Sequence, residues 1–201
     1  MAGHFGILQH LGGGGELFSE LDVAVHPGEM VGVVGPSGCG KSTLGDILLG
    51  VAKPDRGNVI YQDGLPRLAR QKLYQDPPAA LFPHWTLNQL LEDLLRRHRL
   101  EPSVVAPLME RLGLNEHLLA RRPGEISGGE LQRFAILRVL LLKPSFLFAD
   151  EPTSRLDPIT QQQTLSLLVE LAREQACAVM LVSHDPALIA KVCDRQLALA
   201  G

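Results

Sequence analysis

The sequence predicts a layered α/β domain whose sheet is largely parallel. Short runs rich in Val, Ile or Phe alternate with longer runs of helical periodicity, and this alternation is typical of strand–helix–strand units. The length of 201 residues suits one domain that carries a small insertion. Apolar residues make up 45% of the chain and charged residues 20%, a balance that favours a folded globular protein.

Six segments have the pattern of strands, because they are short, apolar and mostly rich in β-branched residues or Phe. They are residues 21–25, Met30–Val34, 58–62, 146–149, Ala178–Val182 and 196–199. The glycine run at 12–15 predicts a flexible turn between two N-terminal strands.

The middle of the chain has a helical pattern instead. Leucines recur at i, i+3, i+4, i+7 and i+8 from Leu87 to Leu95, which gives one apolar stripe on a helix that ends in a basic cluster at 96–99. Further helices are expected at 104–112 and at about 129–142.

We therefore predict a single domain over residues 1–201 that has two lobes. The core lobe, which contains the sheet, is expected at about 1–75 and 143–201, and the helical lobe at about 76–142. Prolines at 77, 78 and 83 stiffen the junction between them, because each fixes φ and removes a backbone donor.

Charge and composition exclude several classes of protein. The net charge of −3 lacks the basic surplus of a nucleic-acid binder. No apolar run approaches the roughly eighteen residues that cross a bilayer, and the N-terminus lacks the basic residues of a secretory signal. The cysteines form no CxxC pair, which favours reduced thiols. We expect a cytosolic chain and, because the sequence stops at Gly201, no added regulatory domain.

A glycine-rich segment follows the strand Met30–Val34 and leads into a helical pattern. It consists of Gly35, Pro36, Ser37, Gly38, Cys39, Gly40, Lys41 and Ser42, with Thr43 next. Its glycines let several backbone N–H groups point at one anion, and a helix N-terminus adds about half a positive charge. In such a phosphate-binding loop (P-loop), Lys41 reaches the β- and γ-phosphates of a nucleotide and the Ser42 hydroxyl holds Mg²⁺. The alternative is a plain glycine-rich turn.

Cys39 lies inside this loop, beside a helix N-terminus and Lys41. The thiolate is the reactive form of cysteine, and positive surroundings of this kind promote it. We therefore expect alkylation of Cys39 to block ATP binding.

Two acidic residues follow the buried-strand pattern at 146–149. Asp150 and Glu151 stand at the carboxyl end of that strand, where ligands gather in open α/β sheets. Asp150 is expected on the Mg²⁺ side of the site. Because neighbouring residues of an extended chain point in different directions, Glu151 is expected to face a water behind the γ-phosphate and to act as catalytic base. A surface turn before Pro152 is the alternative.

A second small, N–H-rich turn precedes the last helix of the helical lobe. Its residues Ser127, Gly128 and Gly129, taken alone, indicate a helix N-cap. Further along, Asp157 ends the run Ser-Arg-Leu-Asp, and His184 stands in a Ser-His-Asp run after a strand. The P-loop, the Ser-Gly-Gly turn, the strand that ends in Asp-Glu and these two later motifs, in this order, resemble the ATP-binding cassette (ABC) ATPase family.

The resemblance covers nearly the whole chain and implies a fold and a set of roles. The implied fold is a P-loop NTPase (RecA-like) core with N-terminal antiparallel β elements and an inserted α-helical subdomain. Gln75 matches the Q-loop residue that contacts Mg²⁺ or the attacking water, and His184 matches the histidine that contacts the γ-phosphate. With Lys41 and Glu151 they form the implied catalytic set. The Ser-Gly-Gly turn matches the signature that completes the site of an opposite subunit, and Asp157 lies at that dimer interface.

Residues 75–87 are similar to the importer branch that takes up peptides, nickel and metal chelates. This similarity implies an ATPase that uses ATP and Mg²⁺ at the cytoplasmic face of the inner membrane, as a peripheral subunit. Implied partners are transmembrane permease subunits, a second ABC ATPase chain that is identical or different, and, indirectly, an extracytoplasmic substrate-binding protein, with no nucleic acid. Trp85 is a candidate anchor for the permease or, alternatively, a packing residue of the helical lobe.

Two other functions stay open. A soluble ABC ATPase that acts on DNA or ribosomes would use the basic clusters at 96–99 and 121–122, and salt-dependent binding to nucleic acid would identify it. A module that holds ATP without hydrolysing it is disfavoured by the presence of Glu151 and His184.

Two positions depart from the family pattern. Glu130 stands where the signature usually has Gln. The residue that stacks on the base falls near His10 and Leu11, where the family tends to place an aromatic ring. Base selectivity is therefore not predicted.

Overall fold

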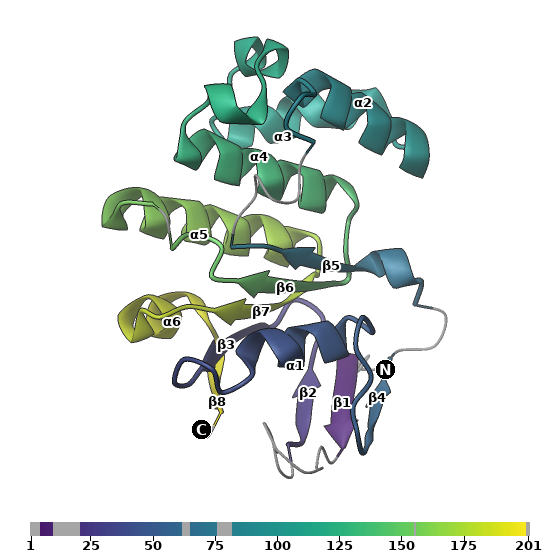
Figure 1. The fold of residues 1–201 in the computed structure, drawn as a ribbon, viewed down its shortest axis with the longest axis vertical. Helices are drawn as coiled ribbons and strands as arrows, with labels where there is room; N and C mark the ends of the chain where they lie inside the picture. The colour runs from purple at the N-terminus through teal and green to yellow at the C-terminus, as the bar shows by residue number, and fades with distance from the viewer. Residues whose placement is uncertain (1–4, 10–20, 62–64, 76–81, 155, 200–201) are drawn as a thin grey trace.

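A computed structural model describes residues 5–9, 21–61, 65–75, 82–154 and 156–199. At its centre is a five-stranded sheet in the order β5-β6-β7-β3-β8, in which every neighbouring pair is parallel (Figure 1). Its strands are β5 (Arg70–Leu73), β6 (Phe146–Asp150), β7 (Ala178–Val182), β3 (Met30–Val34) and β8 (Arg195–Ala198). The predicted α/β class with a parallel sheet is confirmed.

A second, smaller sheet is antiparallel. Its central strand β1 (Phe5–Gln9) pairs with β2 (Val23–Val25) on one side and with β4 (Asn58–Ile60) on the other. These are the N-terminal antiparallel elements that the family resemblance implied. The glycine run at 12–15 lies outside the described residues.

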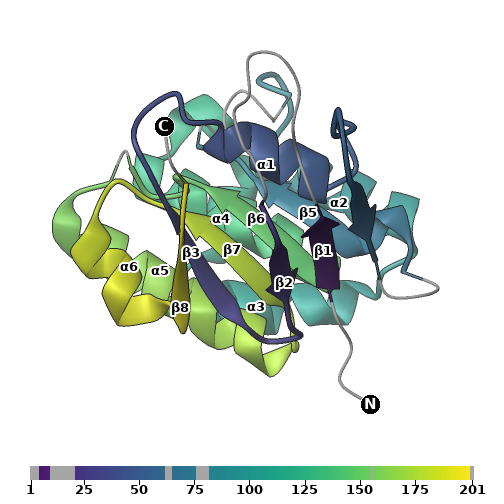
Figure 2. The same cartoon turned by 90° about the horizontal axis from the view of Figure 1, so that it is seen from below.

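Alternate residues of the central strands face two different cores. In β6, Leu147 and Ala149 lie in one buried cluster, whereas Phe146 and Phe148 lie in the other. Figure 2 shows helices on both sides of the central sheet, the side of the small sheet and the side opposite to it. These helices are α1 (Lys41–Leu48) on the first side, and α5 (Pro158–Glu174) and α6 (Pro186–Val192) on the second. Because both faces are covered, every residue of β7 is buried.

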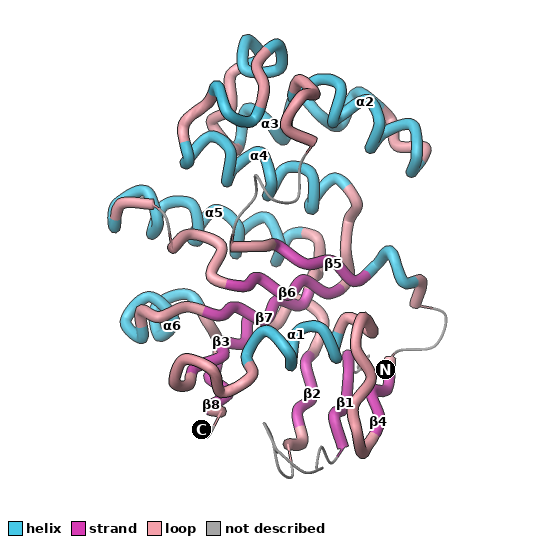
Figure 3. The backbone as a smooth tube through the Cα atoms, viewed as in Figure 1, coloured by secondary structure: helices cyan, strands magenta, loops and turns pink. Residues whose placement is uncertain are grey.

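The described residues between β5 and β6 form only helices and loops (Figure 3). In chain order the elements are α2 (Leu87–His98), η3 (Pro102–Val104), α3 (Val105–Arg111), η4 (Glu116–Ala120), η5 (Pro123–Glu125) and α4 (Gly128–Leu141), with η1 (Arg67–Ala69) just before β5. α2 begins with a capping box of Thr86 and Gln89 and buries most of the predicted leucine stripe. At its basic end, Arg96 and Arg97 pair with Asp93.

Several elements were not named from the sequence. β5 escaped notice because Arg-Gln-Lys-Leu has a single apolar residue, which suits its place at the edge of the sheet. α5 and α6 were also missed. The division into two lobes stays a prediction, because one buried cluster contains residues of α2 and α4 together with residues of α5 and β7. Within the part of the chain that the structure describes, no helix is long and apolar enough to cross a lipid bilayer.

Candidate functional site

The predicted P-loop lies between the end of β3 and the start of α1. Gly38 and Gly40 have φ angles of 82° and 91°, a left-handed conformation that glycine adopts without steric cost. Gly35 is required for a different reason, because a Cβ there would lie 2.8 Å from the backbone oxygen of Leu199. A Cβ at Gly38 would meet no atom within 4 Å, so open space borders the loop at that point. The loop backbone therefore curves around a space that a ligand can enter.

Positive charge is concentrated at this loop. Lys41 is only 8% exposed, and its Nζ donates to the backbone oxygens of Gly35 and Pro36, each at 2.9 Å. Neither carbonyl carries a net charge, so these partners do not neutralise the ammonium group. Gly40, the N-cap of α1, has no side chain with which to cap the first-turn N–H groups. A phosphate group fits this combination of a buried cation and free N–H donors.

Cys39 contributes to the loop through its backbone. Its N–H donates to the oxygen of Pro36 at 3.3 Å, whereas its side chain is 6% exposed and packs beneath Gly35. The buried sulfur is shielded from reagents in the folded protein, and the expectation that alkylation of Cys39 blocks ATP binding stays a prediction. The other loop side chains, of Pro36, Ser37, Ser42 and Thr43, are exposed.

Lys72 of β5 links α1 to the end of β6. Its Nζ lies 2.7 Å from Oδ1 of Asp46 in α1 and 3.8 Å from Oδ2 of Asp150, the last residue of β6. Ser42 stands one helical turn before Asp46, on the same face of α1. The Ser42 hydroxyl is thus next to Asp46 on α1, and the Asp150 carboxylate is the second partner of the same Lys72 ammonium. Both are oxygen donors, the ligand type that Mg²⁺ prefers.

The chain changes direction immediately after Asp150. Glu151 has a φ of 47°, a left-handed conformation that is uncommon outside glycine and often occurs at functional sites. Its N–H donates to the backbone oxygen of Val182 in β7 at 3.1 Å, which holds the turn against the sheet. Strand alternation was the expected reason for the divergence of the two acidic side chains. That reason is wrong, because the strand ends at Asp150 and Glu151 belongs to the turn.

Gln75 and His184 both contact the carboxylate of Glu151. His184 Nε2 lies 2.6 Å from Oε1, and Gln75 Nε2 donates to Oε2 at 3.4 Å. The same Gln75 nitrogen donates to the hydroxyl of Ser154 at 3.3 Å. The Glu151 side chain is 15% exposed and that of His184 is 61% exposed, so the carboxylate lies deeper than the imidazole. A carboxylate held in this way can accept a proton from a water molecule in front of it.

The Ser-Gly-Gly turn forms the start of α4. Ser127 Oγ accepts from the N–H of Glu130 at 3.3 Å, and both the hydroxyl and the N–H of Ser127 donate to the Glu130 carboxylate. These hydrogen bonds from the Ser127 side chain and backbone lower the pKa of Glu130. A Cβ at Gly129 would lie 3.6 Å from Cγ2 of Thr160, so the turn packs near the start of α5. Gly128 has open space around it.

Asp157 caps α5. Its Oδ1 accepts from the N–H groups of Ile159 and Thr160, each at 3.1 Å, and hydrogen bonding to Thr160 is the main cause that lowers its pKa. Among the described residues of a single chain, neither Asp157 nor Ser127 contacts Lys41. The P-loop, Asp150 and the Glu151 cluster thus follow strands of the same parallel sheet, whereas neither helix start has a hydrogen bond to Lys41 among the described residues.

Three further residues at this site were not predicted from the sequence. Lys72 and Asp46 form an ion pair beside Asp150, and Ser154 binds Gln75. The i, i+4 spacing of Ser42 and Asp46 was a signal available in the sequence. Lys72 gave none, because its strand was not recognised. His10 and Leu11 lie outside the described residues, so the base-stacking position stays a prediction.

A model of the ABC transporter family matches residues 18–154. The chain belongs to the ABC transporter family. The resemblance inferred from the order of motifs is thereby confirmed, and membership in this ABC family supports ATP binding.

Curated relatives of this ABC chain are ATP-binding proteins of import systems. The oligopeptide transport ATP-binding protein OppF of Salmonella typhimurium is 35% identical over 196 residues, which cover 89% of this chain and 59% of OppF. The nickel import system ATP-binding protein NikE of Staphylococcus aureus is 32% identical over 189 residues, covering 91% of this chain and 79% of NikE. The chain thus spans less than two thirds of the length of OppF.

Solved ABC structures share the fold. The ATP-binding cassette MJ0796, solved as a dimer in a post-hydrolysis state bound to ADP and phosphate, superposes with a TM-score of 0.76 at 27% identity. The match covers 99% of this chain and 94% of that one. The P-loop NTPase fold expected from the resemblance is confirmed.

Proposed function

We propose that this chain is the ATP-hydrolysing subunit of an ABC importer, which powers uptake of peptides, nickel or metal chelates through separate transmembrane subunits. The observation that carries the proposal is the contact of Gln75 and His184 with Glu151, at the same edge of the sheet as the P-loop. This arrangement joins a phosphate cradle to a positioned carboxylate, as hydrolysis of a nucleotide requires.

The family resemblance and the contacts described above support the following roles for the residues. Lys41 and the backbone N–H groups of residues 37–43 bind the phosphates of ATP, while Ser42, Asp150 and Gln75 hold Mg²⁺. The metal, when bound, stabilises negative charge on the phosphate oxygens. Glu151 orients a water molecule and accepts its proton, and His184 contacts the γ-phosphate.

A second ABC ATPase chain completes the site. Ser127, Gly128 and Gly129 present a helix N-terminus that suits a phosphate, but among the described residues Lys41 donates to Gly35 and Pro36 and not to Ser127. The turn of one subunit therefore serves the P-loop of the other, with Asp157 at the interface. The dimeric state of MJ0796 supports this arrangement. A homodimer and a heterodimer both satisfy it.

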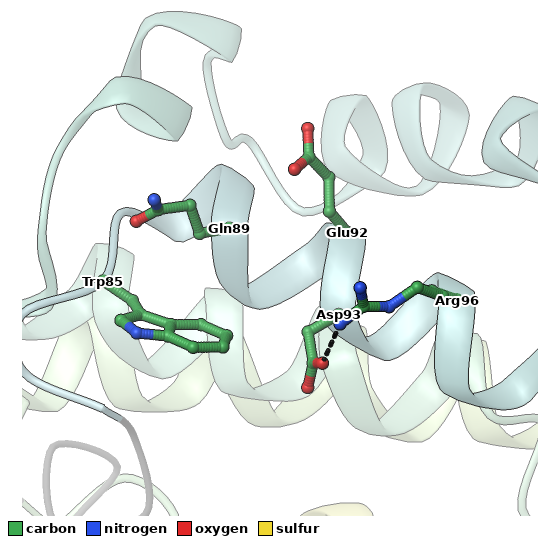
Figure 4. A pocket seen from close by; sticks show the side chains of 5 residues that line it. All are labelled: Trp85, Gln89, Glu92, Asp93 and Arg96. Atoms are coloured by element: carbon green, nitrogen blue, oxygen red, sulfur yellow. Dashed lines mark hydrogen bonds and ion pairs between the residues drawn. The ribbon is translucent and has the colours of Figure 1, made fainter.

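The permease subunits bind beside α2. A cavity of about 300 Å³ there is lined by Trp85, Gln89, Glu92, Asp93 and Arg96 (Figure 4). The last four share one helix face at i, i+3, i+4 and i+7 spacing, and the half-buried ring of Trp85 lies 5.1 Å from that of Phe82. An aromatic floor with a charged rim suits a short amphipathic helix. The chain would then be peripheral at the cytoplasmic face of the inner membrane, and a substrate-binding protein outside would act through the permease.

Co-purification from membranes tests this proposal. The full chain carries an affinity tag in cells that express it, and detergent extracts are compared with extracts that contain tagged Trp85→Ala. We expect two multispanning proteins and an ABC ATPase chain, identical or different, to be recovered, and the assembly to release phosphate from ATP. Recovery of ribosomes or nucleic acid in a salt-dependent manner, without multispanning proteins, would favour the soluble ATPase instead. An assembly that binds ATP without phosphate release would indicate a non-hydrolysing module.

A further inference from the structure

Lys72 places a cation beside the carboxylate that is expected to face Mg²⁺. Its side chain is 11% exposed, and its Nζ lies 3.8 Å from Oδ2 of Asp150 and 2.7 Å from Oδ1 of Asp46. The rings of Phe148 and Tyr74 flank the ammonium, with centroids at 5.8 Å and 5.4 Å. Aromatic walls and low exposure limit screening by water, so the charge of Lys72 acts strongly on nearby groups.

The position of Asp46 gives this cation a second partner. Asp46 lies one turn after Ser42 on the same face of α1, and its Oδ1 is closer to the ammonium than Asp150 is. Lys72 therefore has one short ion pair with Asp46 of α1 and one longer contact with Asp150 at the end of β6. Replacement of either partner would change how much of the ammonium charge Asp150 experiences.

We propose that Lys72 is a positioning residue that sets the Mg²⁺ affinity of the nucleotide-bound protein, and that Asp46 holds its ammonium partly away from Asp150. This inference rests on the proposed function, because it assumes an ATP·Mg²⁺ site at Asp150. The ammonium and the divalent cation are both attracted to the Asp150 carboxylate and repel each other. With Asp46 present, the Lys72 ammonium weakens Mg²⁺ binding less than a lysine that paired with Asp150 alone would, but more than a neutral side chain would.

Two substitutions shift metal affinity in opposite directions. Lys72→Met removes the competing charge and leaves the negative charge of Asp46, so Mg²⁺ should bind more tightly, by on the order of tenfold. Asp46→Asn frees the ammonium to pair with Asp150 alone, so Mg²⁺ should bind more weakly, by several-fold. Lys72→Arg keeps the charge and should stay closer to the wild-type value than Lys72→Met does.

The test measures metal coupling rather than turnover. The purified full chain is titrated with a fluorescent, non-hydrolysable ATP analogue over a series of Mg²⁺ concentrations and in EDTA. The dependence of nucleotide affinity on Mg²⁺ gives the coupling for each variant, and thermal unfolding checks that each is folded. Lys191→Met, which removes an exposed lysine of α6, is the matched control for net charge. Lys72→Gln supplies a second neutral side chain in case Met does not fold.

We expect the nucleotide affinity of Lys72→Met to increase at lower Mg²⁺ concentrations than that of the wild type. For Asp46→Asn, the same increase should require higher Mg²⁺ concentrations than in the wild type. Equal coupling in Lys72→Met, Lys191→Met and the wild type would overturn the inference and leave Lys72 with a structural role, visible only as a lower melting temperature. Tighter metal binding by Asp46→Asn would also overturn it. A wild-type chain that binds no nucleotide at any Mg²⁺ concentration would instead refute the proposed function on which the inference depends.

Discussion

Nε2 of His184 lies 2.6 Å from Oε1 of Glu151, although the two residues follow different strands, β7 and β6. Gln75, which follows β5, contacts the other oxygen of the same carboxylate. Three neighbouring strand ends thus hold one acidic group from two sides. This geometry positions Glu151, which limits the reorganisation needed for proton transfer.

Replacement of Glu151 by Gln tests its role as the base. The amide keeps the size of the side chain but does not accept a proton, so ATP hydrolysis should fall by about 10²- to 10⁴-fold. ATP binding should persist, and ATP-bound dimers should accumulate. Phosphate release and size-exclusion chromatography with ATP measure the two effects. Unchanged turnover would show that another group takes the proton.

Replacement of Ser127 by Ala separates the two uses of the Ser-Gly-Gly turn. Loss of the N-cap of α4 should destabilise the isolated chain by about 1 kcal/mol. The same change should abolish ATP-dependent dimerisation, because the turn contributes to the partner's site. Chemical denaturation and light scattering with ATP report the two effects.

Thr86→Ala is the matched control for Ser127→Ala. Thr86 caps α2 through the same kind of capping box, so its loss should also destabilise the chain by about 1 kcal/mol. ATP-dependent association should nevertheless continue. If both variants lose association to the same extent, the effect of Ser127 is one of stability alone.

Asp157→Asn should flatten the acid limb of the stability curve. Hydrogen bonds from Thr160 and neighbouring N–H groups hold the pKa of Asp157 below its usual 3.8. A carboxyl group whose folded pKa is below its unfolded pKa stabilises the fold above the unfolded value, and this contribution is lost as the pH falls through the folded value. Asn also caps helices but does not titrate, so the urea midpoint of Asp157→Asn should depend less on pH below 4 than that of the wild type. Parallel curves for both proteins would contradict this prediction.

Gly45→Ala should destabilise the packing of α1 on β6. A Cβ at Gly45 would lie 2.3 Å from Cε1 of Phe148, so helix and strand would have to separate, at a cost of about 1–3 kcal/mol. Gly124→Ala is the control, because a Cβ there would meet no atom within 4 Å. Urea denaturation of both variants measures the difference. Equal stability would mean that α1 shifts freely on the sheet.

Trp85→Ala should weaken recovery of the membrane partner. The half-buried indole forms the aromatic part of the cavity beside α2, and such residues carry a large share of binding energy. His84→Ala, at the exposed neighbouring position, is the control and should retain the partner. Quantitative recovery of multispanning proteins from detergent extracts provides the measurement. Equal recovery with both variants would assign Trp85 to packing of the helical lobe.

Local patterns account for what could be predicted. β3, β7 and the leucine stripe of α2 were found where expected, because an element that is buried on one or both faces has a recognisable pattern of apolar residues in the sequence. β5 has no such pattern, since an edge strand has fewer buried positions. The partner of its Lys72, Asp46, is distant in sequence, so the ion pair could not be predicted either. The burial of Cys39 beneath Gly35 was not predicted for a related reason, because it depends on how the loop folds.

The order and spacing of the motifs by themselves determined the family, the phosphate loop and the identity of the acidic pair, because these depend on residue types that are adjacent in the chain. Tertiary structure alone decided which groups meet. The parallel sheet brings the ends of β5, β6 and β7 to one edge, and so it joins Gln75, Glu151 and His184 and sets Lys72 against Asp150. Contacts between segments so far apart in sequence depend on strand order and on the left-handed turn at Glu151, and no local pattern records either.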